Sequence, residues 1–312
     1  MRRSASGLLA VAVIVLALGG CALLVGPPVA DFDVRPVVMY AGDRIDLDGS
    51  PSDGDIVDYR WDVDGLVEHG RTLTTTFARP GIHTVRLTVE DGQGRTDRIE
   101  RALTVYARSG TRLFFEEFSD GDAALGRWPL DPTWAVQGES RIESISGGPG
   151  HVLYVNSATE TLHRRTARLD LPPLRIGQRL VFSVRAMPLQ TQGQHTFVIA
   201  PGRSGMDLPP IGLPYYVFSS TYGGSVIREP SAAGTEVGHP VAFAPPVYEW
   251  HTYTLSYSAA QYEFSVDGAV WQTGTMDADP SRGATSWLLL GDESLTEACQ
   301  VYYDEIVVSV EE

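Results

Sequence analysis

Apolar and polar residues alternate along most of this chain, and this alternation limits the fold more than any other feature. In the segment 81–91, every second residue from His83 to Val89 is apolar or aromatic, and the residues between them are polar or charged. A period of two is typical of a β-strand with one buried face. Segments 56–63 and 180–186 follow the same pattern, and no long stretch has a helical period. The chain is therefore predicted to be all-β.

Turn residues divide these strands into two groups. The chain of 312 residues contains 32 Gly and 20 Pro, and clusters such as Ser50–Gly54, Asp91–Gly94 and Asp267-Gly268 lie between alternating segments. A length of this order suggests about two domains. We place a short linker at residues 107–111, between a domain at 29–106 and a larger one at 112–312.

The first domain is predicted to be an immunoglobulin-like sandwich with Trp61 in its core, because about seven short strands fit into about 80 residues. Segments 43–65 and 77–91 resemble the two halves of a PKD domain. The Trp61–Gly65 turn is one residue shorter than the usual family pattern, and His83 replaces a usual Tyr. The resemblance implies an extracellular spacer or interaction module without catalytic activity.

The second domain has room for about a dozen strands, which favours a jelly-roll sandwich. Segments 113–121, 249–268 and 301–308 resemble the concanavalin A-like lectin/glucanase superfamily, in its laminin-G-like branch. This resemblance implies a fold more than a ligand.

The N-terminus indicates export. Arg2 and Arg3 precede an apolar run that ends in Leu18-Gly19-Gly20-Cys21. This pattern resembles a bacterial lipobox, so we predict a signal peptide at 1–20, a lipid on Cys21 and a linker at 21–28. The protein would then be anchored to a bacterial membrane and face the periplasm or the cell exterior. An uncleaved signal anchor at 7–25 is the alternative, since 19 uncharged residues are just long enough to span a bilayer.

Charge and cysteine content exclude several classes of protein. The formal net charge of −15 repels phosphate backbones, so nucleic acid is not an expected partner. With only two cysteines, a small fold held by several disulfides is excluded. Once Cys21 carries a lipid, Cys299 is the remaining thiol, and we expect it to be buried beside Val301.

No catalytic motif is recognisable. The Glu-x-Asp-x-x-Glu pattern of laminarinase-type members is absent. The adjacent pairs Glu116-Glu117 and Asp304-Glu305 should point to opposite faces of their strands, which favours structural roles. We therefore predict a non-catalytic protein; a glycoside hydrolase with an unrecognised cross-strand carboxylate pair is the alternative.

Aromatic residues favour binding of carbohydrate or of another surface ligand. Sugar rings stack on aromatic side chains while polar neighbours bind hydroxyl groups. The segment 214–224 combines aromatic, hydroxyl and glycine residues, so Tyr215 and Tyr222 are candidate ligand contacts, together with Trp271 after a hairpin turn. A structural spacer or an adhesin that binds protein remains a third possibility.

Calcium is the one candidate cofactor. Asp53, Asp55 and Asp91 lie in the turns of the first domain, and Ca²⁺ prefers several oxygen ligands from neighbouring residues. Aspartate is also the default residue of such turns, and the EF-hand spacing is absent.

Overall fold

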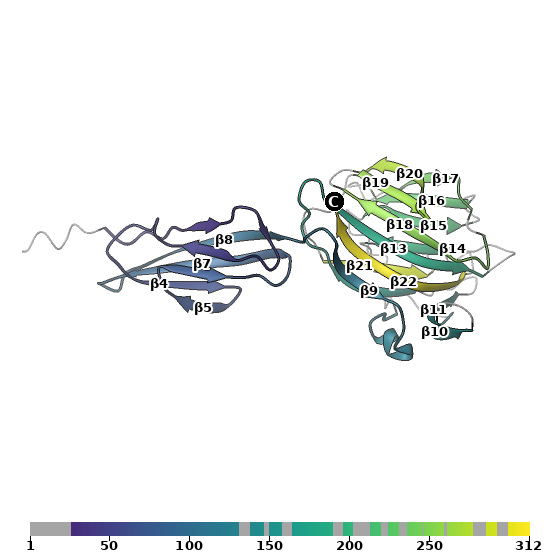
Figure 1. The fold of residues 1–312 in the computed structure, drawn as a ribbon, viewed down its shortest axis with the longest axis horizontal. Helices are drawn as coiled ribbons and strands as arrows, with labels where there is room; N and C mark the ends of the chain where they lie inside the picture. The colour runs from purple at the N-terminus through teal and green to yellow at the C-terminus, as the bar shows by residue number, and fades with distance from the viewer. Residues whose placement is uncertain are drawn as a thin grey trace, which may run out of the picture. The chain divides into compact units, whose positions relative to one another are not determined.

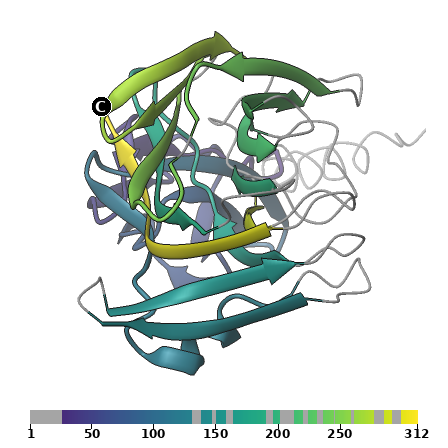
Figure 2. The ribbon, with the colours of Figure 1, turned by 90° about the vertical axis from the view of Figure 1, so that its right-hand side faces the viewer.

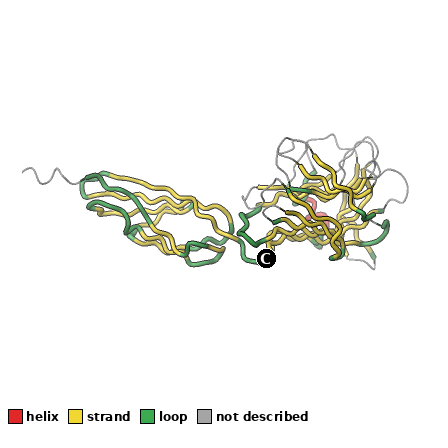
Figure 3. The backbone as a smooth tube through the Cα atoms, turned by 90° about the horizontal axis from the view of Figure 1, so that it is seen from above, coloured by secondary structure: helices red, strands yellow, loops and turns green. Residues whose placement is uncertain are grey.

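The computed structural model is all-β, as the alternation predicts (Figure 1, Figure 3). It describes residues 26–130, 138–146, 150–157, 164–189, 196–201, 213–219, 224–230, 236–244, 246–258, 261–276, 285–291 and 299–312. Within these residues no helix is long and apolar enough to cross a bilayer. The described chain divides into two compact units, with the main division between Val105 and Tyr106 and with Arg79–Gly81 grouped with the second unit.

The first unit consists of a three-stranded and a five-stranded sheet, in the orders β1-β3-β6 and β2-β8-β7-β4-β5. Its strands are β1 (Asp33–Arg35), β2 (Met39–Tyr40), β3 (Ile45–Asp48), β4 (Ile56–Val63), β5 (Leu66–His69), β6 (Thr72–Thr75), β7 (Gly81–Asp91) and β8 (Thr96–Tyr106).

Trp61 is the centre of the first core, as predicted. It is fully buried, and its ring meets that of Phe32 edge to face at 5.2 Å between centroids. Its indole Nε1 donates to the carbonyl of Gly70 at 2.8 Å. The alternating residues Val85 and Leu87 of β7 are fully buried in the same core.

The second unit contains two larger sheets. One has eight strands in the order β10-β11-β22-β13-β18-β19-β20, with β9 also paired to β22, and the other has six in the order β12-β21-β14-β15-β16-β17. The strands are β9 (Thr111–Glu116), β10 (Gly138–Ile145), β11 (Gly150–Ser157), β12 (Arg164–Asp170), β13 (Arg179–Pro188), β14 (Thr196–Pro201), β15 (Tyr215–Ser219), β16 (Gly224–Pro230), β17 (Glu236–Val241), β18 (His251–Tyr257), β19 (Gln261–Val266), β20 (Ala269–Thr275), β21 (Thr285–Gly291) and β22 (Cys299–Glu311). A short 3₁₀ helix spans Gly121–Gly126.

The two sheets of this unit share one apolar core. The core side chains of β13 are Leu180, Phe182, Val184 and Ala186, all buried, which confirms the alternation predicted for this strand. Cys299 is buried as well, as expected. The intervening residues of β13 therefore lie on the opposite, outer face of the eight-stranded sheet. β10 and β11 form one edge of this sheet, the two teal strands at the bottom of Figure 2.

The same hairpin turn occurs once in each unit. Asp64 and Asp267 have φ of 49° and 50°, and the glycine after each has φ of 88° and 80°, the geometry that an Asp-Gly hairpin turn requires. The Asp64 carboxylate lies 2.5 Å from His83 Nδ1, and the Asp267 carboxylate lies 2.6 Å from His251 Nδ1.

The aspartates of these turns are expected to make the free energy of unfolding fall at acidic pH. Burial opposes ionisation of Asp267, but hydrogen bonds from the Thr252 N–H and His251 outweigh it, so its pKa is lowered. A carboxylate whose pKa is lower in the folded than in the unfolded chain stabilises the fold above the unfolded value of about 3.9. This contribution is lost as the pH falls through the folded value.

We therefore expect Asp267→Asn to lower the free energy of unfolding more at pH 7 than at pH 3. Urea unfolding of both proteins at the two pH values measures this difference. An equal loss at both pH values would show that the ionised carboxylate has no special role.

Candidate functional site

A row of aromatic side chains crosses the outer face of the eight-stranded sheet. Tyr154 of β11 and Tyr302 of β22 are paired directly across their strands, with ring centroids 5.3 Å apart. Trp250, just before β18, stacks on Tyr302 at 6.5 Å and 21° between ring planes. Leu153 and Tyr303, the sequence neighbours of the two tyrosines, lie in the core, so the tyrosines themselves are on the outer face. Tyr302 is half-buried there, whereas Tyr154 is only 8% exposed because the Arg141 guanidinium lies over its ring. We call Tyr154, Tyr302 and Trp250 the aromatic row.

Charged side chains hold one end of the aromatic row. The guanidinium of Arg141 lies 4.4 Å from the centre of the Tyr154 ring and pairs with Glu139 and Glu143. The Tyr302 hydroxyl donates to Glu143 at 2.5 Å. Burial and this carboxylate raise the pKa of Tyr302 to about 12, so the hydroxyl stays protonated and the ring is fixed in place.

Arg185 of β13 joins the other end of the row to a pocket. Its guanidinium lies 5.0 Å from the centre of the Trp250 ring, and its Nη1 donates to the buried Asp304 at 3.0 Å. Burial raises the pKa of Asp304, while Arg185 opposes that shift. The pocket has a volume of about 360 Å³. We call it the acidic pocket, and it is lined by Glu117, Ser119, Gly150, His151, Arg185, Asp304 and Glu305.

A β-bulge brings two adjacent carboxylates to the acidic pocket. The register between β13 and β22 shifts between Val184 and Ala186, so that Asp304 and Glu305 together oppose Arg185. Strict alternation would send the two carboxylates to opposite faces, and that prediction is wrong here because a bulge inserts one extra residue.

Glu116 and Glu117 separate as predicted. Glu116 is buried and accepts hydrogen bonds from the Phe118 N–H at 2.8 Å, Arg127 Nε at 2.7 Å and Trp128 Nε1 at 3.3 Å. Its carboxylate is therefore fully engaged in holding the chain after β9. Glu117 is exposed and lines the acidic pocket.

The described structure does not bring the predicted ligand residues together. Tyr215 is fully buried beside Val217 in the six-stranded sheet, so its ring is not available to a ligand. Trp271 lies in β20 of the other sheet, 40% exposed, with its ring 5.2 Å from that of Phe243. Tyr222 lies outside the described residues.

The predicted calcium ligands take part in turns. The buried Asp91 accepts a hydrogen bond from Arg95 Nε at 2.6 Å, and Asp53 accepts one from the Gly54 N–H at 2.8 Å. Asp55 is exposed. Over the described residues, no three His, Cys, Asp or Glu side chains gather in a group that could hold a metal ion.

The aromatic row was not found from the sequence, because the row depends on which strands pair. Tyr154 and Tyr302 each sit among alternating residues, but their segments are far apart in the chain and become neighbours only because β11 pairs with β22. Trp250 precedes its strand, where alternation gives no orientation.

Comparison with known proteins identifies the first unit. Residues 25–105 match the family described as PKD domain. Comparison with curated proteins gives no match.

Solved structures resemble both parts of the chain. The PKD1 domain of Vibrio anguillarum Epp is 25% identical, over 27% of this chain and 99% of that one, with a TM-score of 0.24. A glycoside hydrolase family 16 endo-glucanase from Bacteroides ovatus is 14% identical over 63% and 99%, with a TM-score of 0.43. The CBM22-1 xylan-binding domain from Paenibacillus barcinonensis Xyn10C is 13% identical over 66% and 99%, with a TM-score of 0.37. Residues 25–105 are thus a PKD domain, and the chain is an all-β protein in which a larger β-sandwich follows it.

Proposed function

We propose that this protein is an exported, lipid-anchored and non-catalytic binding protein that recognises carbohydrate on the outer face of the eight-stranded sheet. The aromatic row is the observation that carries this proposal: Tyr302 and Trp250 are its partly exposed rings, and the buried Tyr154 packs against Tyr302. The PKD domain would act as a spacer between the membrane and the binding domain.

The chemistry of the row suits a sugar ring. Aromatic faces stack on the C–H faces of sugars, while a few placed polar groups fix the orientation of the ligand. Arg185 supplies hydrogen-bond donors beside Trp250, and Asp304 and Glu305 supply acceptors in the adjoining acidic pocket. Arg141 and Glu143 fix the orientation of the tyrosines in advance, which lowers the entropy that binding costs.

A glycan array probed with residues 29–312 tests the binding, since this segment contains every strand of the structure. We expect retention on glycans without release of reducing ends. A chain that binds surface proteins but no glycan would instead act as an adhesin or spacer.

The acidic pocket gives a specific reason to consider a glycoside hydrolase as the second candidate. Such enzymes use two carboxyl groups, one of them an acid with a raised pKa. Burial raises the pKa of Asp304 in this way, and Glu117 and Glu305 line the same pocket. We favour binding because the Asp304 carboxylate is occupied by Arg185. If reducing ends accumulate with wild-type protein but not with Asp304→Asn, the protein is an enzyme.

The lipid anchor is a separate proposal. Cys21 lies outside the described residues, and the proposal stands on the segment Leu18-Gly19-Gly20-Cys21. In a bacterial host fed labelled palmitate, we expect the wild type to incorporate label and Cys21→Ala to lose nearly all of it. Cys299→Ala is the matched control and should label like the wild type. Equal labelling of all three proteins would show that Cys21 is not the site of lipid attachment and would overturn the lipid anchor.

A further inference from the structure

Small hydroxyl side chains cover the outer face of the eight-stranded sheet beyond the aromatic row. Tyr253, Leu255 and Tyr257 of β18 are buried in the core, so the residues between them face outward. The neighbouring strands repeat this composition in register, since Thr254 pairs with Ser183 of β13 and Ser265 of β19. The hydroxyl residues on the outer face of β13, β18, β19 and β20 are Ser183, Thr252, Thr254, Ser256, Ser265, Thr273 and Thr275. Of these, Ser256 and Ser265 are buried, and the other five are at least partly exposed.

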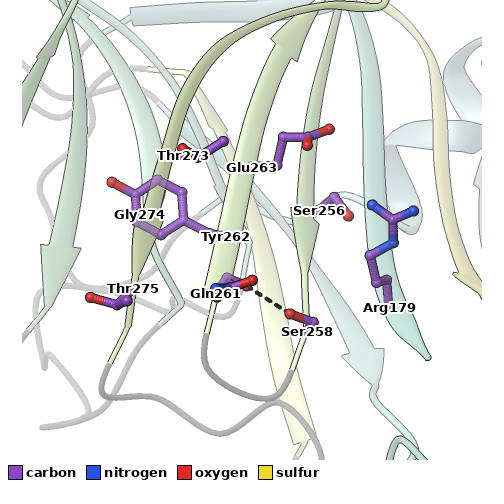
Figure 4. Close-up of a pocket in the computed structure, with 9 residues that line it drawn as sticks. All are labelled: Arg179, Ser256, Ser258, Gln261, Tyr262, Glu263, Thr273, Gly274 and Thr275. Carbon is purple, nitrogen blue, oxygen red and sulfur yellow. Dashed lines mark hydrogen bonds between the residues drawn. The ribbon is translucent and has the colours of Figure 1, made fainter. Parts of the chain in front are cut away.

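A second pocket lies on this face, and Figure 4 shows its lining. Its volume is about 460 Å³. We call it the hydroxyl pocket, and it is lined by Arg179, Ser256, Ser258, Gln261, Tyr262, Glu263, Thr273, Gly274 and Thr275. Hydroxyl and amide groups dominate this set, and such groups both donate and accept hydrogen bonds.

Gly274 shapes the strand beside this pocket. It pairs with Tyr262, and a Cβ at position 274 would lie 2.5 Å from the tyrosine ring. Only glycine leaves room for that ring, which stays buried beneath the strand while Thr273 and Thr275 face outward.

The aromatic row and the hydroxyl pocket lie at opposite ends of the same strands. Arg185 beside Trp250 and Arg179 in the hydroxyl pocket are six residues apart on β13, which corresponds to about 20 Å. Between them lie Ser183 and Thr254, whose hydroxyl oxygens are 3.5 Å apart. No charged side chain lies outward on β13 between the two arginines.

We infer that the aromatic row and the hydroxyl pocket are two ends of one binding lane for an extended, uncharged, hydroxyl-rich polymer, that is, a neutral polysaccharide chain. This inference rests on the proposed function and deepens it. The lane is too long for a single sugar ring, and its hydroxyl groups match those of a polysaccharide laid across the strands.

The charges along the lane select against an anionic polymer. Arg185 is paired with Asp304, and Arg141 is paired with Glu139 and Glu143. The hydroxyl pocket contains one charged residue of each sign, Arg179 and Glu263. The acidic pocket adds the exposed carboxylates of Glu117 and Glu305. A polyanion would meet uncompensated negative charge at this end, while a neutral chain would not.

Affinity should therefore rise with ligand length. The probes are cello-oligosaccharides and xylo-oligosaccharides, from disaccharide to hexasaccharide, titrated calorimetrically into residues 29–312. We expect the hexasaccharide of the preferred series to bind at least tenfold more tightly than the disaccharide, because only the longer ligand reaches both ends. Equal affinity for all lengths would overturn the lane but leave carbohydrate binding intact.

A pair of variants locates the far end of the lane. Gln261→Ala/Thr275→Ala alters exposed residues of the hydroxyl pocket, and it should reduce hexasaccharide affinity about tenfold without changing disaccharide affinity. Gln93→Ala/Thr96→Ala removes the same two residue types from exposed positions of the PKD domain and should change neither. An unchanged hexasaccharide affinity in the first variant would also overturn the lane. If neither oligosaccharide series nor the glycan array gives any binding, the proposed function fails and this inference fails with it.

Discussion

Trp250→Ala is expected to lower the affinity for glycan about 30-fold while leaving the fold intact. A truncated aromatic residue at the centre of a binding site typically costs about 2 kcal/mol, and 1.4 kcal/mol corresponds to a factor of ten. Trp250 stacks on Tyr302 and lies under the Arg185 guanidinium, so its loss removes one of the two partly exposed rings of the aromatic row. Calorimetric titration of the glycan found on the array measures the loss, and thermal unfolding checks the fold.

Trp271→Ala is the matched control, because it removes the same residue type from an exposed position outside the row. It should bind like the wild type. If Trp271→Ala loses binding and Trp250→Ala does not, the site predicted from the sequence is right and the aromatic row is wrong. Tyr302→Phe should keep most of the affinity, since it retains the ring and removes only the hydroxyl bound to Glu143.

Glu116→Ala is expected to destabilise the second unit by about 3 kcal/mol. Glu116 is 3% exposed, and its removal leaves the Phe118 N–H, the Trp128 indole and one side of Arg127 without their acceptor. Each unsatisfied buried donor costs about 1–3 kcal/mol. The lost contact with Arg127 contributes little to this loss of about 3 kcal/mol, because the Arg127 side chain is 47% exposed and solvent screens its charge.

A loss of this size should lower the melting temperature of the second unit by about 6–12 °C, which calorimetry can measure. Glu117→Ala is the neighbouring control and should stay within about 0.5 kcal/mol of the wild type, as an exposed residue. An unchanged melting temperature in Glu116→Ala would contradict the structural role of this carboxylate and return it to the candidates for catalysis.

Much of the fold follows from the sequence because burial in a strand follows a simple period. Val85 and Leu87 are buried as alternation requires, and Asp267-Gly268 forms a hairpin turn as its residue types predict. The PKD domain could be predicted because its characteristic residues, Trp61 and the flanking turns, form one short continuous segment of the sequence.

The proposed binding surface could not be predicted in the same way, because it depends on which strands pair. Alternation states that Tyr215 and Tyr216 face opposite sides, but not that both are fully buried. It places Tyr302 on an outer face without showing that Tyr154 lies beside it. The bulge at Asp304 and Glu305 interrupts the two-residue alternation of the strand, and the residue types at these positions do not predict a bulge.

The most direct test of the central claim is calorimetric titration of a neutral polysaccharide into residues 29–312, with reducing ends measured in the same sample. The account predicts saturable binding that is lost about 30-fold in Trp250→Ala, with no increase in reducing ends. Binding that is unchanged in Trp250→Ala, or reducing ends that accumulate with time, would contradict it.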